Sequence, residues 1–267
     1  MNNDRIQEIL DLMEEARLDY FLISDPQSIA YCTGYYNDPH ERMFVFMISK
    51  HGNHTLFMND LFYLDHDLDV NIVWHKDGQD AIQTIVDEMH FPGRIGIDKN
   101  WASHFLLDLM KKLPDAKYIN ASPCVDLVRM KKDLQEQVLM IESSKINDAV
   151  MEEIIPFIQE GVTEKQLAKK LDELFFNHHS TCYGAIVAFG KNAADPHHEN
   201  DDTLLRKGDC VLIDMGCVYK GYCSDMTRTF FYEGILEEEI KVYEIVKKAN
   251  EAAEAMIKPG VKLSDID

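Results

Sequence analysis

Residues 207–229 read KGDCVLIDMGCVYKGYCSDMTRT, and most expectations for this chain start from them. The apolar runs Cys210–Val218 and Cys223–Tyr232 are typical of buried β-strands. Lys220 and Gly221 lie between the runs and suit a tight turn, because glycine adopts the left-handed backbone that such turns need. The stretch therefore predicts an antiparallel hairpin.

Each predicted strand carries one aspartate, Asp214 in the first and Asp225 in the second. If Lys220 and Gly221 form the turn, Asp214 lies opposite Thr227 and Asp225 is its diagonal neighbour. If the turn starts one residue earlier, the two aspartates lie directly opposite each other. Either register places both carboxylates on one face of the hairpin, with Cβ atoms roughly 5–8 Å apart.

Two carboxylates that converge on one face suit a pair of hard divalent cations, which convert bound water into a nucleophilic hydroxide. Two aspartates are too few ligands for a complete dinuclear site, since each ion needs further oxygen or imidazole donors. The structural alternative is that Asp214 is satisfied within the hairpin, by Thr227, Thr229 or Arg228.

A second candidate for chemistry is the segment GKNAADPHHE at residues 190–199, which follows a predicted strand over Gly184–Phe189. Pro196 restricts the backbone before His197, so this imidazole can be held in a fixed position. A histidine there could donate a hydrogen bond to a substrate carbonyl or to a developing oxyanion. The alternative is a surface loop with two solvated histidines.

The remaining sequence of the second half is helical in pattern, with helices expected over Leu134–Gln159 and Glu237–Lys258. Between them, Thr163-x-x-Gln166 is a capping-box pattern that predicts the start of another helix. Its apolar stripe consists of Leu167, Leu171, Leu174 and Phe175.

An internal similarity links two turns that each follow a long helix. The sequence IQEGVT at residues 158–163 resembles IKPGVK at 257–262, and Ser264-x-x-Asp267 is again a capping-box pattern. A protein rarely stops in the first turn of a helix, because that turn leaves unsatisfied N–H groups. We therefore expect an interrupted repeat, with one whole domain and about half of a second in this chain.

The first half alternates short apolar runs with helical patterns, which indicates an α/β domain. Strands are expected over Tyr20–Ile23, Phe44–Ile48, His54–Met58, Asn71–Trp74 and Ile95–Asp98, and helices over residues 1–20, Ala81–His90 and Trp101–Leu113. We expect this domain to end near Pro123–Val128, which gives one domain over residues 1–126 and a second over residues 127–267.

The composition excludes several classes of function. The 27 basic and 47 acidic residues give a net charge of −20, which argues against binding to nucleic acid or to an anionic membrane. No secretory signal pattern is present, and apolar runs such as Met43–Ile48 are too short to span a bilayer. The six cysteines include no C-x-x-C pair and are expected to be reduced, so we expect a cytoplasmic protein.

These motifs resemble those of the creatinase/prolidase/aminopeptidase P family, the pita-bread metallopeptidases of family M24. The resemblance rests on residues 190–199 and on RKGDCVLIDMGCVYKGYCSDMTRTF at 206–230, with support from YCTGY at 31–35 and from RMKK at 129–132 with Glu136. It covers essentially the whole chain and is closest to the bacterial Xaa-Pro dipeptidases. It implies an α/β N-terminal creatinase-like domain plus the first half of an α+β pita-bread catalytic domain.

The resemblance also implies roles for individual residues. Asp214 matches a metal ligand, Asp225 matches the aspartate that bridges two divalent ions, and His197 matches a histidine that contacts substrate and stabilises the tetrahedral intermediate. The ions would be manganese, or else cobalt or zinc. The implied substrate is a proline-containing dipeptide or peptide, cleaved before proline, and the implied assembly is a homodimer.

The same resemblance implies that one histidine and two glutamates complete the metal site, together with a second catalytic histidine and a glutamate base. These 267 residues contain no counterparts of them, so we expect this polypeptide alone to be inactive. One alternative is a creatinase-like amidinohydrolase that needs no metal, although the presence of both Asp214 and Asp225 counts against it. Another alternative is a non-catalytic binding protein on the same scaffold.

Overall fold

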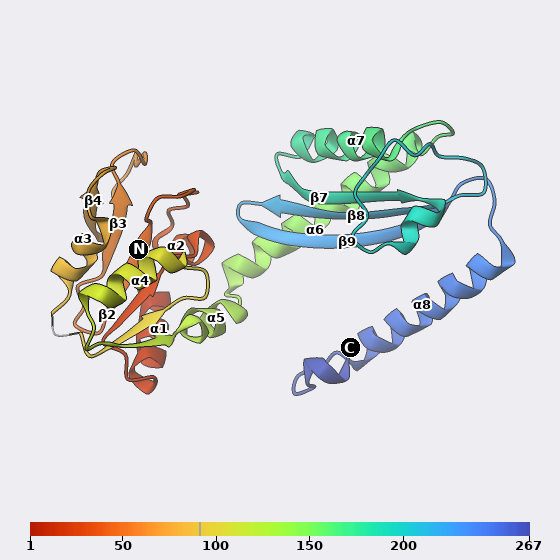
Figure 1. Ribbon diagram of the computed structural model, residues 1–267. Helices are drawn as coiled ribbons and strands as arrows, with labels where there is room; N and C mark the ends of the chain where they lie inside the picture. Colours follow the sequence, from red (N-terminus) through yellow and green to blue (C-terminus); the bar gives the residue numbers. More distant parts are fainter. Residues whose placement is uncertain (91) are drawn as a thin grey trace. The chain divides into compact units, whose positions relative to one another are not determined.

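The computed structural model describes residues 1–90 and 92–267, which form two compact units, Met1–Lys132 and Asp133–Asp267 (Figure 1). Residues 126 and 127, the boundary expected from the sequence, lie inside the helix α5 (Ser122–Met130). This helix packs on α1 (Asn3–Glu15), and its Val125 and Val128 are buried in the core of the first unit. The division of the chain therefore follows the end of α5.

The first unit is built on a mixed sheet, which has six strands among the described residues, in the order β4-β3-β2-β1-β5-β6. Parallel pairs join β1 to β5, β5 to β6 and β3 to β4, whereas β2 is antiparallel to both neighbours. The strands are β1 (Tyr20–Ile23), β2 (Val45–Ser49), β3 (Thr55–Asn59), β4 (Asn71–His75), β5 (Arg94–Ile97) and β6 (Lys117–Asn120).

Helices cover both faces of this sheet, because side chains along its central strands are apolar on both sides. In β1, Phe21 and Ile23 point into one core, and Tyr20 and Leu22 point into the other. The first core is closed by α1, α2 (Pro26–Thr33) and α5, and the second by α3 (Ala81–Glu88) and α4 (Ser103–Lys112).

The second unit contains an antiparallel three-stranded sheet among the described residues, in the order β7-β8-β9. Its strands are β7 (Thr181–Phe189), β8 (Cys210–Tyr219) and β9 (Tyr222–Phe231). The helices α6 (Leu134–Ile154) and α7 (Glu164–Asn177) cover one face of this sheet (Figure 1). The predicted stripe of α7 is buried there, together with the alternate β8 residues Val211, Ile213, Met215 and Cys217.

Polar contacts fix the β8–β9 hairpin on α6. The hydroxyl of Tyr222 donates to Glu136 at 2.9 Å, and Ser143 bonds to the carbonyl oxygen of Cys217 at 3.2 Å and to the hydroxyl of Ser224 at 2.9 Å. Glu136 is buried and also belongs to the capping box that begins α6. These contacts hold one face of the hairpin and leave the opposite face open.

The turns of the internal similarity adopt the same local conformation. Gly161 and Gly260 have φ angles of 83° and 90°. The N–H groups of Val162 and Val261 donate to the carbonyl three residues earlier, at 3.1 and 3.2 Å. The expected capping box at Ser264 is wrong, because Ser264 lies inside the 3₁₀ turn Leu263–Asp265 and cannot precede it as a cap.

The helix α8 (Glu237–Met256), which is described throughout, buries none of its residues. Its exposed apolar side chains include Val242, Ile245 and Val246. Among the described residues, no helix combines the length and the apolar character required to cross a membrane.

Candidate metal and substrate site

The turn of the β8–β9 hairpin fixes the position of both aspartates. Lys220 and Gly221 have φ angles of 49° and 84°, which is the left-handed geometry of a two-residue hairpin turn. Asp214 is paired with Thr227, and Asp225 is paired with Gly216, two positions further along β8. The register predicted with Lys220 and Gly221 as the turn is confirmed, so the two aspartates are diagonal neighbours on one face.

The two carboxylates have different surroundings. Asp214 is half-buried, and its Oδ1 accepts a hydrogen bond from the hydroxyl of Thr227 at 2.5 Å. Asp225 is exposed, and its carboxylate has no hydrogen-bond or ion-pair partner among the described residues. The structural alternative, in which partners within the hairpin satisfy Asp214, therefore holds for one oxygen of Asp214. The carboxylate of Asp225 remains available to a ligand.

Gly216 lies beside these carboxylates at a crowded position that has little room for a side chain. It lies on the same face as Asp214 and directly opposite Asp225. A Cβ atom at Gly216 would lie 3.1 Å from the carbonyl oxygen of Ser224 and 3.3 Å from Cβ of Tyr183. The two aspartates offer hard oxygen donors on one face, which suits a divalent cation, so the residues present fit part of a metal site.

His197 lies on the loop that follows β7 and is exposed. Its N–H donates to Oδ1 of Asp195 at 3.1 Å, and no hydrogen bond or ion pair among the described residues joins it to Asp214 or Asp225. The structure therefore brings the two aspartates together on one face, and places His197 on a separate loop.

The end of this loop runs beside the outer edge of β7. Asn200 accepts from the N–H of Val187 and donates to the carbonyl of Ala185, both at 2.7 Å. Ile186, between these two residues, is paired with Asp214. Since neighbouring strands are about 4.8 Å apart, Asn200 lies on the order of 10 Å from Asp214 across the sheet.

The sequence did not identify Glu164, which connects this loop to α7. Its side chain is fully buried and lies 2.6 Å from Nε2 of His198, whose side chain is 12% exposed. One signal was present: Glu164 is three residues before Leu167 and continues the apolar stripe of α7, where a charged residue is unexpected. A charged residue on such a stripe requires partners, and only the folded chain identifies them.

Glu164, His198 and Asp201 offer ligand atoms within 4.8 Å of one another. Their contacts are direct: Oε2 of Glu164 accepts from His198 at 2.6 Å and from the N–H of Asp201 at 3.1 Å. Hydrogen bonds from the hydroxyl and the N–H of Thr203 hold the pKa of Asp201 below its usual range. In this structure Glu164 accepts hydrogen bonds from both other residues, so the cluster is a hydrogen-bonded network.

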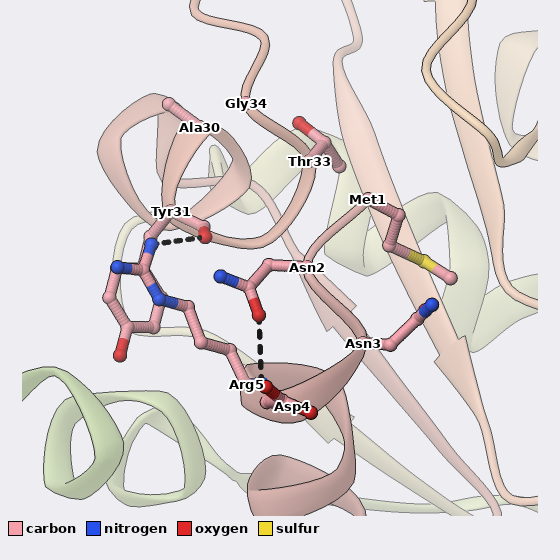
Figure 2. A pocket seen from close by; sticks show the side chains of 9 residues that line it. All are labelled: Met1, Asn2, Asn3, Asp4, Arg5, Ala30, Tyr31, Thr33 and Gly34. Carbon is pink, nitrogen blue, oxygen red and sulfur yellow. Dashed lines mark hydrogen bonds between the residues drawn. The ribbon is translucent and has the colours of Figure 1, made fainter. Parts of the chain in front are cut away.

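A hollow of about 510 Å³ in the first unit lies beside the start of α1 and the end of α2 (Figure 2). The guanidinium of Arg5 stacks 3.9 Å from the ring centroid of Tyr31 and donates to its carbonyl at 3.0 Å. Asn2 accepts from the N–H of Arg5 (Figure 2). These polar groups are engaged within the fold, and the predicted site residues do not line the hollow.

Comparisons with known proteins agree with the two-part organisation. The model of the creatinase/prolidase N-terminal domain matches residues 5–131, and that of metallopeptidase family M24 matches residues 138–267. An uncharacterized peptidase of Staphylococcus aureus is 29% identical, and the alignment covers 98% of this chain and 76% of that protein.

Two solved structures are similar over nearly the whole chain. A dipeptidase from Pyrococcus horikoshii is 32% identical with a TM-score of 0.88, over 98% of this chain and 75% of that one. A prolidase from Thermococcus sibiricus is 27% identical with a TM-score of 0.90, over 100% of this chain and 75% of that one. The structural likeness therefore extends across both units.

Proposed function

Because this chain belongs to metallopeptidase family M24, we propose that it carries part of the active site of a metal-dependent peptidase that cleaves the bond before proline. Its fold is a creatinase-type N-terminal domain followed by part of the M24 catalytic domain. The proposal rests on one observation above all: the β8–β9 register places Asp214 and Asp225 on one open face. The similar prolidase of known structure supports a proline-containing dipeptide or peptide as the substrate.

In this proposal, Asp214 and Asp225 would both supply carboxylate ligands to the divalent ions. Bound ions of this kind lower the pKa of water and polarise the carbonyl that is attacked. His197 donates a hydrogen bond to the substrate carbonyl oxygen, whose negative charge grows as the tetrahedral intermediate forms.

We propose manganese as the metal, because carboxylate oxygens suit this cation. The family resemblance adds cobalt and zinc as alternatives. Two aspartates supply fewer ligands than a dinuclear site needs, so the 267-residue polypeptide is expected to bind manganese weakly and to hydrolyse Xaa-Pro dipeptides negligibly. A homodimer and a cytoplasmic location complete the proposal, and the six free cysteines support the latter.

Manganese titration of the 267-residue protein, followed by the electron paramagnetic resonance of free Mn²⁺, tests the metal site. Asp214→Asn and Asp225→Asn should each abolish the weak binding, because each removes one negative ligand. Asp148→Asn, an exposed position on α6, is the matched control and should bind as the parent does. Unchanged binding in Asp225→Asn would rule out the site.

Hydrolysis assays separate the peptidase from its alternatives. Strong Xaa-Pro turnover by the 267-residue polypeptide would contradict the claim that two aspartates supply too few ligands for activity. In a polypeptide that also supplies the remaining ligands of the family, Asp225→Asn should abolish Xaa-Pro hydrolysis. Retained turnover there, or hydrolysis of creatine without metal, would favour the amidinohydrolase instead.

A further inference from the structure

The carboxylate of Glu164 holds both ends of the loop that carries His197. Its Oε1 accepts from the N–H of Phe189 at 2.8 Å and from the side-chain amide of Asn192 at 2.9 Å, where the loop begins. Its Oε2 accepts from Nε2 of His198 at 2.6 Å and from the N–H of Asp201 at 3.1 Å, where the loop ends. Each oxygen therefore serves one end of the loop, and His197 lies between the ends.

The position of Glu164 makes this arrangement stable. The residue is the first of α7, and its side chain is fully buried. A buried carboxylate is costly unless hydrogen bonds and a favourable field compensate for lost hydration. The donors from the loop and the positive end of the α7 dipole provide both. The capping box of Thr163 and Gln166 fixes the helix start from which Glu164 extends.

We propose that Glu164 is a positioning residue for His197, acting through His198 and the loop backbone. This inference rests on the proposed function, because it assumes that His197 contacts substrate. Asn200 holds the loop against β7 beside Ile186, the residue paired with Asp214. The ties to Glu164 and Asn200 together set where His197 stands relative to the two aspartates.

The inference requires a carboxylate at position 164. A glutamine there keeps one acceptor oxygen and turns an NH₂ group toward donors at the other end of the loop, so one end loses its acceptor. Glu164→Gln should therefore loosen the loop without removing the apolar contacts of α7. Glu173→Gln is the matched control, because Glu173 is on the same helix and pairs only at the surface with Lys170 among the described residues.

Residue-resolved amide hydrogen exchange on the 267-residue protein tests the proposal. In Glu164→Gln, the amides of Phe189 and Asp201 should exchange at least tenfold faster, while those of Val211 and Ile213 in β8 stay within twofold of the parent. Glu173→Gln should leave both sets unchanged. Unchanged exchange at both loop ends would overturn the proposal, and equal acceleration in β8 would reduce Glu164 to a general stabilising residue.

His198 provides an independent test if Glu164→Gln fails to fold. His198→Ala removes one donor and should accelerate exchange at Asp201 while sparing Phe189. His198→Gln keeps an N–H donor and should restore slow exchange. Equal exchange in the two His198 variants would contradict the proposed contact.

Nuclear magnetic resonance of the parent gives a further signature. The Nε2–H proton of His198 should be visible at low field and protected from solvent, and it should disappear in Glu164→Gln. A visible proton that is unaffected by Glu164→Gln would also contradict the contact.

The role of His197 itself is tested separately. If the loop loosens as expected but His197→Ala leaves Xaa-Pro hydrolysis unchanged in a polypeptide with a complete ligand set, the proposed function fails. In that case the positioning of the loop by Glu164 still stands.

Discussion

The carboxylate of Asp19 links three strands of the first sheet. It lies just before β1, and its Oδ2 accepts from the N–H groups of Gly93 and Arg94 at 2.9 and 2.7 Å, at the start of β5. Its Oδ1 pairs with Lys50, directly after β2. Burial alone raises the pKa of Asp19, but the bonds from Lys50, Arg94 and Gly93 outweigh it and lower the pKa.

Asp19→Asn should reduce the free energy of unfolding at pH 7 by about 1–2 kcal/mol, since a charged acceptor is lost at a partly exposed site. The pKa is lower in the folded state than in the unfolded chain. The contribution is therefore present above about pH 4 and disappears as the pH falls through the folded pKa. Urea unfolding at pH 7 and pH 3 checks this, with exposed Asp115→Asn as control. An equal loss of unfolding free energy in Asp19→Asn at pH 7 and at pH 3 would contradict the lowered pKa of Asp19.

Single residues also show how far the sequence predicts the site. Asp214 and Asp225 could be identified because a carboxylate in an apolar strand is costly unless it has a partner. The turn at Lys220 restricted the register in which they pair. The role of Glu164 could not be predicted. Its donors come from a strand end and a loop up to 37 positions away, and no local pattern encodes such contacts.

At the scale of elements, the β8–β9 turn makes a second prediction. Gly221→Val should destabilise the second unit by about 1–2 kcal/mol, because a side chain disfavours the left-handed backbone that this position requires. Lys220→Asn should change stability by less than about 0.5 kcal/mol, because asparagine tolerates that backbone. Urea unfolding measures both, and equal midpoints for Gly221→Val and the parent would contradict the assigned turn.

Most elements agree with the sequence patterns to within a few residues, because their apolar periodicity or their breakers were strong. The helix α6 was predicted to reach Gln159 but ends at Ile154, because Pro156 follows and cannot continue an α-helix. The elements α2, β6 and α5 were not predicted. In β6 the residues KYIN are exposed or half-buried and lack an apolar run, and both helices are short.

At the scale of the molecule, each unit encloses its own apolar core. Phe21 is fully buried in the first unit and Phe175 in the second. We expect denaturant unfolding to show two transitions, each sensitive to one substitution only. Phe21→Ala and Phe175→Ala should each cost about 3–5 kcal/mol in their own transition. A single transition that both substitutions shift equally would contradict independent cores.

The bare apolar side of α8 has a consequence for the behaviour of concentrated samples. Val242, Ile245 and Val246 are each more than 60% exposed, on a chain whose net charge is −20. Like-charge repulsion opposes contacts between these side chains on different copies. Screening lengths shrink from about 8 Å at physiological ionic strength to about 3 Å at 1 M salt. Added salt should therefore weaken this repulsion and favour contacts between copies through α8, whereas buffers of low ionic strength should oppose them.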